Sequence, residues 1–109
     1  MNAFTGTWTQ ITSPTLDADY LSSQGAPYIR LRLRQQRLEG EYQLGPRRGH
    51  IDGRLQDQGP IVFSFEGMDG AELVNGAGLA WLQDDCLHFH LLYHFGDDVA
   101  FAARRPDDG

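Results

Sequence analysis

The sequence has few of the features that anchor or cross-link a small chain. Its single cysteine, Cys86, excludes an intrachain disulfide and fits a reducing compartment. No apolar run approaches the ~18 residues of a membrane-spanning helix, and no charged-then-apolar leader opens the chain. The formal net charge of −6 argues against nucleic acid as a partner. We therefore expect a soluble cytoplasmic protein that binds neither nucleic acid nor membrane.

The composition favours one globular domain built from β-strands. Apolar residues make up 40% of the chain and aromatic residues 11%, which argues against disorder. A length of 109 residues is enough for one hydrophobic core. Thirteen glycines and several turn dipeptides favour an all-β chain. We expect a single barrel domain over residues 1–105 and a flexible C-terminal tail over residues 106–109.

The stretch Cys86–Arg105 predicts a β-hairpin and fixes which side chains face inward. From Leu87 to Phe95 the odd-numbered residues are apolar, and histidines stand at three of the alternate positions. This period of two is typical of a half-buried strand. A three-residue loop at Gly96–Asp98 would pair Phe95 with Val99. That register places both apolar rows on one face, which a slip of one residue would destroy.

The rest of the chain predicts six more short strands and two long loops. The strands are expected at residues 4–11, 28–34, 38–44, 50–56, 61–66 and 78–83. The long loops are Thr12–Pro27, in which Leu16–Leu21 is compatible with one helical turn, and Gly67–Ala77. Because no helix separates any two strands, the fold class predicted is an eight-stranded antiparallel up-and-down (meander) β-barrel. Closure also removes exposed sheet edges.

Three short motifs resemble a known barrel family. TGTW at 5–8, LEGEY at 38–42 and IDGRL at 51–55 resemble the first, third and fourth strands of avidin and streptavidin. The GTW at 6–8 also resembles the opening motif of lipocalins, within the larger calycin group. The resemblance covers about half of the chain. It implies the same small barrel, in which inward glycines leave room for bulky neighbours.

The resemblance would also imply a biotin site, but most of the matching positions differ. Tyr42 aligns with a tyrosine that contacts biotin, and Asp98 lies near the final aspartate of the family. Gln10, Leu44 and Phe65 stand where the family has asparagine, serine and tryptophan. We therefore do not expect biotin binding.

Loop lengths indicate which end of the barrel is open. Successive loops of a meander alternate between the two ends, so both long loops fall at the same end. Ligand sites in such barrels gather where variable loops gather, so we expect a small apolar or amphipathic molecule there. The alternative is a core filled by aromatic side chains, with at most a shallow cup at the mouth. The candidate ligand-binding residues are Trp8, Tyr20, Tyr28, Tyr42, Tyr93 and Asp98.

The outer face of the last three strands predicts self-association. A two-residue turn at Asp84–Asp85 pairs Gln83 with Cys86 and sends Trp81 outward, whereas a three-residue turn would put Trp81 inside. An exposed apolar wall is typical of an interface, here a homodimer or a dimer of dimers. Protonation of its histidines, whose unperturbed pKa is about 6.5, would loosen it near about pH 5. The candidate interface residues are Leu79, Trp81, His88, His90, Leu92, Ala100 and Ala102.

No motif predicts a metal, a cofactor or a catalytic centre. His88 and His90 share a face, but His94 lies ~13 Å further along the strand, so we expect no metal site. No Ser-His-Asp arrangement can be assembled from the spacing. Three functions stay open: a ligand-binding barrel that self-associates, a structural domain with a filled core, and a small barrel enzyme of the cyclase or isomerase type.

Overall fold

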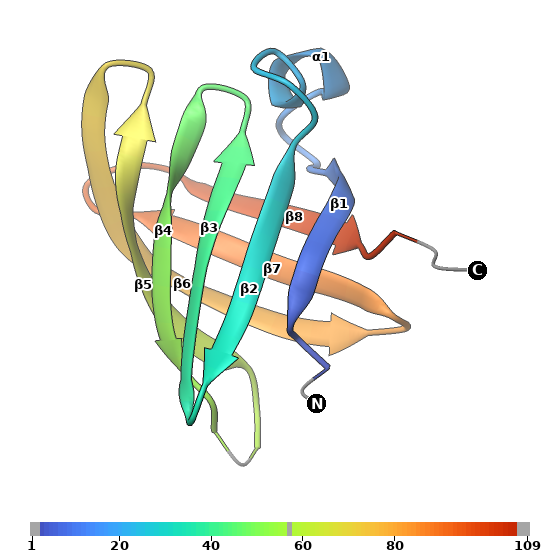
Figure 1. The fold of residues 1–109 in the computed structure, drawn as a ribbon. Helices are drawn as coiled ribbons and strands as arrows, with labels where there is room; N and C mark the ends of the chain where they lie inside the picture. The colour runs from blue at the N-terminus through green and yellow to red at the C-terminus, as the bar shows by residue number, and fades with distance from the viewer. Residues whose placement is uncertain (1–2, 57, 107–109) are drawn as a thin grey trace.

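The computed structural model describes residues 3–56 and 58–106. Eight strands follow one another around a closed barrel, each antiparallel to the next, and β1 closes the ring against β8 (Figure 1). The predicted meander barrel is confirmed. The elements are β1 (Gly6–Thr12), α1 (Ala18–Leu21), β2 (Tyr28–Arg34), β3 (Arg37–Leu44), β4 (Arg47–Arg54), β5 (Ile61–Asp69), β6 (Glu72–Gln83), β7 (Cys86–Tyr93) and β8 (Asp98–Arg104).

The barrel is flattened into two crossing layers. In Figure 1, β1–β5 run nearly upright in front, β6 starts beside β5 and bends across behind them, and β7 and β8 also cross behind. The described chain measures 35 × 34 × 21 Å along its principal axes, as such a flattened shape requires. The short helix α1 covers one end, where the β3–β4 and β5–β6 turns also lie. We call this end the mouth. No helix among the described residues is long and apolar enough to cross a membrane.

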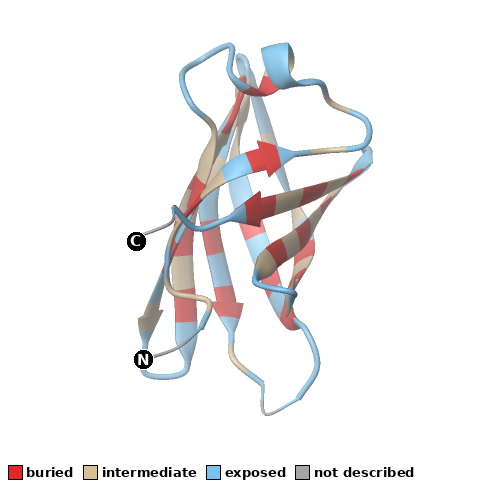
Figure 2. Cartoon of the chain, turned by 90° about the vertical axis from the view of Figure 1, so that its right-hand side faces the viewer, coloured by how far each residue is buried: buried red, intermediate tan, exposed pale blue. Residues whose placement is uncertain are grey.

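The core is filled by side chains that alternate along each strand. Buried and exposed bands follow one another along the strands in Figure 2. Trp8 and Phe89 are 0% exposed and Tyr42 is 2% exposed. The rings of Phe89 and Phe101 are stacked across the β7–β8 pair, with centroids 4.9 Å apart. The interior is therefore packed with aromatic and aliphatic side chains, as a barrel of this width allows.

The turn between β6 and β7 is the predicted two-residue turn. Gln83 pairs with Cys86 and Trp81 with His88. Asp84 and Asp85 have φ angles of 55° and 63°, which suits a type I′ turn. The alternative three-residue turn, which would have placed Trp81 inside, is excluded. Helix α1 also falls within the predicted helical turn.

The predicted register of the last hairpin is wrong. Leu91, and not Phe95, lies opposite Val99, so the pairing is displaced by four residues. The chain turns earlier, because the Tyr93 amide donates a hydrogen bond to the Asp97 carbonyl oxygen at 3.0 Å. An even displacement keeps both apolar rows on the inner face. Phe95 itself leaves the core and is 98% exposed.

The second predicted long loop is a strand extension. β5 continues to Asp69 and β6 begins at Glu72, so only two residues turn the chain. Gly67 pairs with Gly49 of β4, and a Cβ at Gly67 would overlap the Arg48 carbonyl oxygen. The glycines let β4 and β5 approach each other closely here. The sequence pattern had instead indicated a loop over this segment. Only the first long loop remains at the mouth.

The start of one strand and the alternation along another also differ from the prediction. β4 begins at Arg47, and not at His50, because the turn needs only Gly45 and Pro46. In β1 the register shifts between Thr9 and Thr12 around a bulge. The bulge reverses the alternation and buries Ile11. Of the predicted tail, residues 107–109 lie outside the described residues.

Candidate functional site

An arginine on the inner face of the barrel mouth is the starting point of the candidate site. Gly45 has a φ of 67°, and with Pro46 it makes a tight turn that starts β4 at Arg47. Ile51 faces the core, and side chains two apart on a strand share a face. Arg47 therefore lies on the inner side and is only half-buried.

Helix α1 holds a tyrosine against this arginine. The Nε of Arg47 donates a hydrogen bond to the Tyr20 hydroxyl at 2.9 Å. Asp17 caps the helix by accepting a hydrogen bond from the Tyr20 amide at 2.9 Å. Leu21, 1% exposed, anchors the helix in the core. The Arg47 guanidinium also lies over two rings, 5.7 Å from the Tyr20 centroid and 5.0 Å from the Tyr93 centroid.

The charge of Arg47 lacks a carboxylate partner in the described part of the chain. The ion pairs found there join arginines and acids on the outer faces of β2–β4, and none includes Arg47. Burial by itself lowers the pKa of Arg47, but the neighbouring Tyr20 and Tyr93 oxygens outweigh it and raise the pKa overall. The guanidinium is therefore a fixed positive charge that no carboxylate neutralises within the described residues.

Two phenol groups beside Arg47 are also without partners. The hydroxyl oxygens of Tyr42 and Tyr93 are buried, and neither makes a hydrogen bond within residues 3–56 and 58–106. Burial raises the pKa of both phenols. The Arg47 guanidinium lowers it by less, through its close approach to the Tyr93 oxygen, which falls short of hydrogen-bond geometry, and through its charge alone at Tyr42. Both groups therefore stay neutral and keep an O–H to donate. A buried hydroxyl without a partner is costly, at about 1–3 kcal/mol, and calls for an explanation.

Arg47 and one of the three tyrosines, Tyr93, lie at a hollow in the mouth. The hollow has a volume of about 390 Å³, and Arg47 and Tyr93 line it. Tyr42 lies deeper and is linked to Tyr93 through Phe65, by ring centroid distances of 6.2 Å and 5.0 Å. Tyr42 is near enough to Tyr93 and Arg47 for both to shift its pKa. Arg47 and Tyr93 are therefore the members of this cluster that line the hollow itself.

The rim of the hollow is apolar on one side. Leu73 is 83% exposed and Phe95 is 98% exposed, and both line the hollow. Phe95 has a φ of 57°, a conformation that costs a bulky residue about 1–3 kcal/mol. A strained, fully exposed aromatic side chain beside a hollow indicates a role other than packing. Acidic side chains complete the rim, at Asp69, Glu72 and Asp97.

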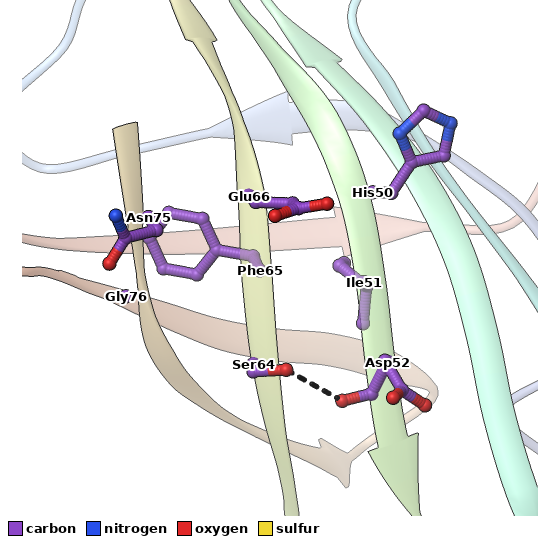
Figure 3. Close-up of a pocket in the computed structure, with 8 residues that line it drawn as sticks. All are labelled: His50, Ile51, Asp52, Ser64, Phe65, Glu66, Asn75 and Gly76. Atoms are coloured by element: carbon purple, nitrogen blue, oxygen red, sulfur yellow. Dashed lines mark hydrogen bonds between the residues drawn. The ribbon is translucent and has the colours of Figure 1, made fainter. Parts of the chain in front are cut away.

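A second hollow lies on the outer wall of β4–β6 (Figure 3). It has a volume of about 450 Å³ and is lined by His50, Ile51, Asp52, Ser64, Phe65, Glu66, Asn75 and Gly76. Its polar side chains are all exposed, and its one internal bond runs from Ser64 Oγ to the Asp52 carbonyl oxygen at 3.4 Å. It holds no buried polar group in need of a partner, so the mouth is the better candidate.

The structure brings three of the six predicted ligand residues together. Tyr20, Tyr42 and Tyr93 surround Arg47, as described above. Asp98 lies instead on the outer face of β8, where it pairs with Leu92.

Trp8 and Tyr28 are placed away from the hollow. Trp8 is fully buried, its Nε1 donates to the Phe4 carbonyl oxygen at 2.9 Å, and Arg105 lies 4.6 Å from its ring centroid. Tyr28 faces outward, with the Arg30 guanidinium 5.1 Å from its ring centroid.

Three residues that line the hollow are not among the candidate ligand residues, although Arg47 was expected at the rim of this end. The inward position of Arg47 could have been predicted from the sequence. Side chains two apart on a strand share a face, so Ile51, Gly49 and Arg47 face the same way if the strand extends that far. Leu73 was assigned to a loop, and Phe95 resembled the continuation of an inward row. Nothing in the sequence pattern indicated that the side chains of Leu73 and Phe95 are exposed.

The seven predicted interface residues lie together on the outer face of β6–β8. The indole of Trp81 is stacked on His88, with centroids 5.5 Å apart and planes at 11°. Its edge contact with His90 measures 5.1 Å. Within the described residues, no three His, Cys, Asp or Glu side chains gather closely enough to hold a metal ion.

Comparison of the chain with models of known protein families, with curated proteins and with solved structures finds no match. The closed antiparallel barrel agrees with the calycin-type fold that the sequence motifs implied.

Proposed function

We propose that this protein binds a small amphipathic molecule with an anionic head, which enters the barrel mouth and meets Arg47. The main observation is the cluster of unpaired donors in the described chain: the buried hydroxyls of Tyr42 and Tyr93 beside an arginine without a carboxylate partner. Only an acceptor group can satisfy such donors.

A carboxylate head fits this cluster. Its oxygens accept hydrogen bonds from the terminal nitrogens of Arg47 and from the Tyr93 hydroxyl, while Nε stays bonded to Tyr20. Hydrogen bonds to an ionised group are about twice as strong as neutral ones. The partial burial of Arg47 strengthens the attraction, because water screens it less than at the surface.

The rest of the ligand fits the rim. Leu73 and Phe95 offer apolar surface to a short hydrocarbon or aromatic tail. The acidic residues Asp69, Glu72 and Asp97 repel further negative charge. We therefore favour a monoanion over a polyanion such as a nucleotide.

Competition among three eight-carbon probes tests this proposal. Octanoate, octanol and octylammonium each compete with a fluorescent naphthalene sulfonate for the protein. We expect octanoate to displace the dye at concentrations at least tenfold below those of octanol, and octylammonium to be the weakest. Equal displacement by octanoate and octanol would contradict a role for the charge.

Two neighbouring arginines provide the matched variants. Arg47→Met should weaken octanoate binding at least tenfold, about 1.4 kcal/mol. Arg48→Met removes the same charge from the outer face and should leave binding unchanged, since Arg48 is exposed. A similar loss in both variants would indicate a general charge effect, and the mouth would lose its support.

A second function, self-association through the β6–β8 wall, is favoured by the exposed side of Trp81. Together with Leu79 and Leu92 it forms an apolar wall on the outside of a filled barrel. Apolar walls of this kind mark interfaces more often than monomer surfaces. Sedimentation should show a dimer of 12.2 kDa chains for wild type and a folded monomer for Trp81→Arg. A wild-type monomer at micromolar concentration would contradict it.

A further inference from the structure

We propose that two copies of this chain pack their β6–β8 walls face to face about a two-fold axis that follows the cross-strand row Ala80–Phe89–Phe101. This arrangement rests on the self-association proposed above and specifies its geometry. The row is continuous, since Ala80 pairs with Phe89 and Phe89 pairs with Phe101. Its side chains point into the core, so the axis lies over this row on the outside, between the outer faces of the two copies.

The outer face has one row of side chains on each side of this axis. On one side, Trp81 pairs with His88 and His88 with Ala102. On the other side, Leu79 pairs with His90 and His90 with Ala100. A two-fold axis in the plane of the interface, perpendicular to the strands, reverses strand direction. Each row therefore covers the other row of the partner.

The resulting contacts are complementary in size. The indole of Trp81 faces the smaller Leu79 of the partner subunit, and the imidazoles face one another. Ala100 and Ala102 face each other along β8, where small side chains permit the closest approach of two sheets. An aromatic side chain that projects over a smaller partner residue is a common anchor of protein interfaces.

The charges on β8 are also complementary about this axis. Asp98 and Arg104 lie at the two ends of its outer face, six residues or about 20 Å apart. That distance prevents a pair within one chain, and neither residue takes part in an ion pair in the described part of the molecule. The two-fold axis brings Asp98 toward the partner's Arg104, and it does so twice. The same patch thus supplies both members of each pair, as an isologous interface requires.

This charge pattern favours a second copy over another partner. A chain with a net charge of −6 repels itself over most of its surface. On the wall, the outward positions of β8 balance, with Asp98 against Arg104 and two alanines between them. The outward positions of β6 and β7 from Ala77 to Leu92 carry no carboxylate outside the Asp84–Asp85 turn. Self-association therefore meets least repulsion at this face.

Charge reversal on β8 tests the arrangement. Asp98→Arg and Arg104→Asp each place two like-charged pairs in the dimer, so each should raise the dimer dissociation constant at least tenfold. The variant that carries both reversals should dimerise within about threefold of wild type, because opposite charges meet again. Asp97→Arg and Arg48→Asp are matched controls that change net charge equally at exposed sites away from the wall.

Mixing the two single variants gives the sharpest readout. Asp98→Arg and Arg104→Asp, each largely monomeric alone, should form a mixed dimer when combined in equal amounts, because both ion pairs then join opposite charges. Association on mixing also shows that each variant is folded. Analytical ultracentrifugation measures the association of wild type, of each variant and control, and of the mixture.

The outcomes separate this arrangement from self-association itself. If wild type is monomeric, self-association and the two-fold arrangement proposed for it are both wrong. If wild type dimerises but the reversals behave like their controls, or mixing restores nothing, this two-fold axis is wrong and self-association stands.

Discussion

The ring of Phe63 on β5 lies against Gly78, its cross-strand neighbour on β6. A Cβ on Gly78 would overlap that ring. On the other side Phe63 pairs with Gly53 of β4, so a large side chain lies between two residues without one. This pairing explains how a barrel with many inward glycines still has a filled core.

Gly78→Ala should therefore destabilise the barrel by overpacking. The added methyl group overlaps the Phe63 ring and also the His90 carbonyl oxygen, so both must move, which typically costs about 1–3 kcal/mol. Phe63→Leu in the Gly78→Ala background should recover part of that loss, since it vacates the space. Ala77→Ser on the exposed face serves as the control. Urea unfolding of wild type, Gly78→Ala, Phe63→Leu and the double variant gives the coupling energy, and strict additivity of the two core changes would contradict the contact.

Trp8 should be the most costly single truncation of the core. It is fully buried and its indole nitrogen donates to the Phe4 carbonyl oxygen, so Trp8→Ala leaves a cavity and removes this hydrogen bond. We expect a loss of about 3–5 kcal/mol in unfolding free energy. Trp81→Ala, on the outer wall, should cost far less at concentrations where the chain is monomeric. An unchanged denaturant midpoint for Trp8→Ala would contradict its inward position.

The faces of the strands could be predicted because alternation is a local property. The β6–β7 turn shows this well, since two aspartates and the parity of the flanking residues gave the observed pairing of Trp81 with His88. The last hairpin kept its faces although its register was wrong, because the displacement was even. The face of each side chain can therefore be predicted correctly even where the loop length, and with it the register, is predicted wrongly.

The mouth was only half predictable, because its features depend on contacts between distant residues. The glycines near Gly67 indicated a loop, but the structure uses them where β4 and β5 approach each other. The bulge in β1, which buries Ile11, follows from how β1 closes on β8. Phe95 is exposed because its loop turns at Tyr93, a choice between turns of similar local preference.

The outer face of β2–β4 should contribute a pH-dependent stability through Glu41. Arg32 donates to it at 3.1 Å and Arg30 at 3.2 Å. Hydrogen bonds from Arg32 hold the pKa of Glu41 below its usual value, against the burial that raises it. A lowered folded pKa means that the stabilisation is present above the unfolded value, about 4.3, and is lost as pH falls through the folded value.

Glu41→Gln should accordingly cost about 0.5–1 kcal/mol at pH 7, since the arginines are largely exposed. The difference from wild type should vanish at low pH. Glu39→Gln is the control, because its contact with Arg34 is longer, at 3.6 Å, and more exposed. A pH-independent difference for Glu41→Gln would show that the ion pairs are not its cause.

Phe95→Gly should stabilise the free protein and weaken ligand binding. Glycine adopts a positive φ without strain, so the change relieves about 1 kcal/mol in the folded state, partly offset by greater chain entropy when unfolded. The same change removes apolar surface from the rim and should raise the dissociation constant for octanoate several-fold. Thermal unfolding with and without octanoate measures both effects. A destabilised variant with unchanged binding would contradict a ligand role for Phe95.

Tyr93→Phe should separate stability from binding at the mouth. The Tyr93 hydroxyl is buried without a hydrogen-bond partner in the described residues, so its removal from the free protein should leave the unfolding free energy unchanged or slightly higher. Octanoate should bind roughly tenfold more weakly, because a hydrogen bond to an ionised group contributes about 1.5–3 kcal/mol. Tyr28→Phe, on the outer face, should change neither property. Calorimetric titration and urea unfolding provide the two measurements. If Tyr93→Phe instead lowers the unfolding free energy by more than about 1 kcal/mol, the hydroxyl already has a hydrogen-bond partner in the free protein. The unpaired donors would then no longer support an anionic ligand at Arg47.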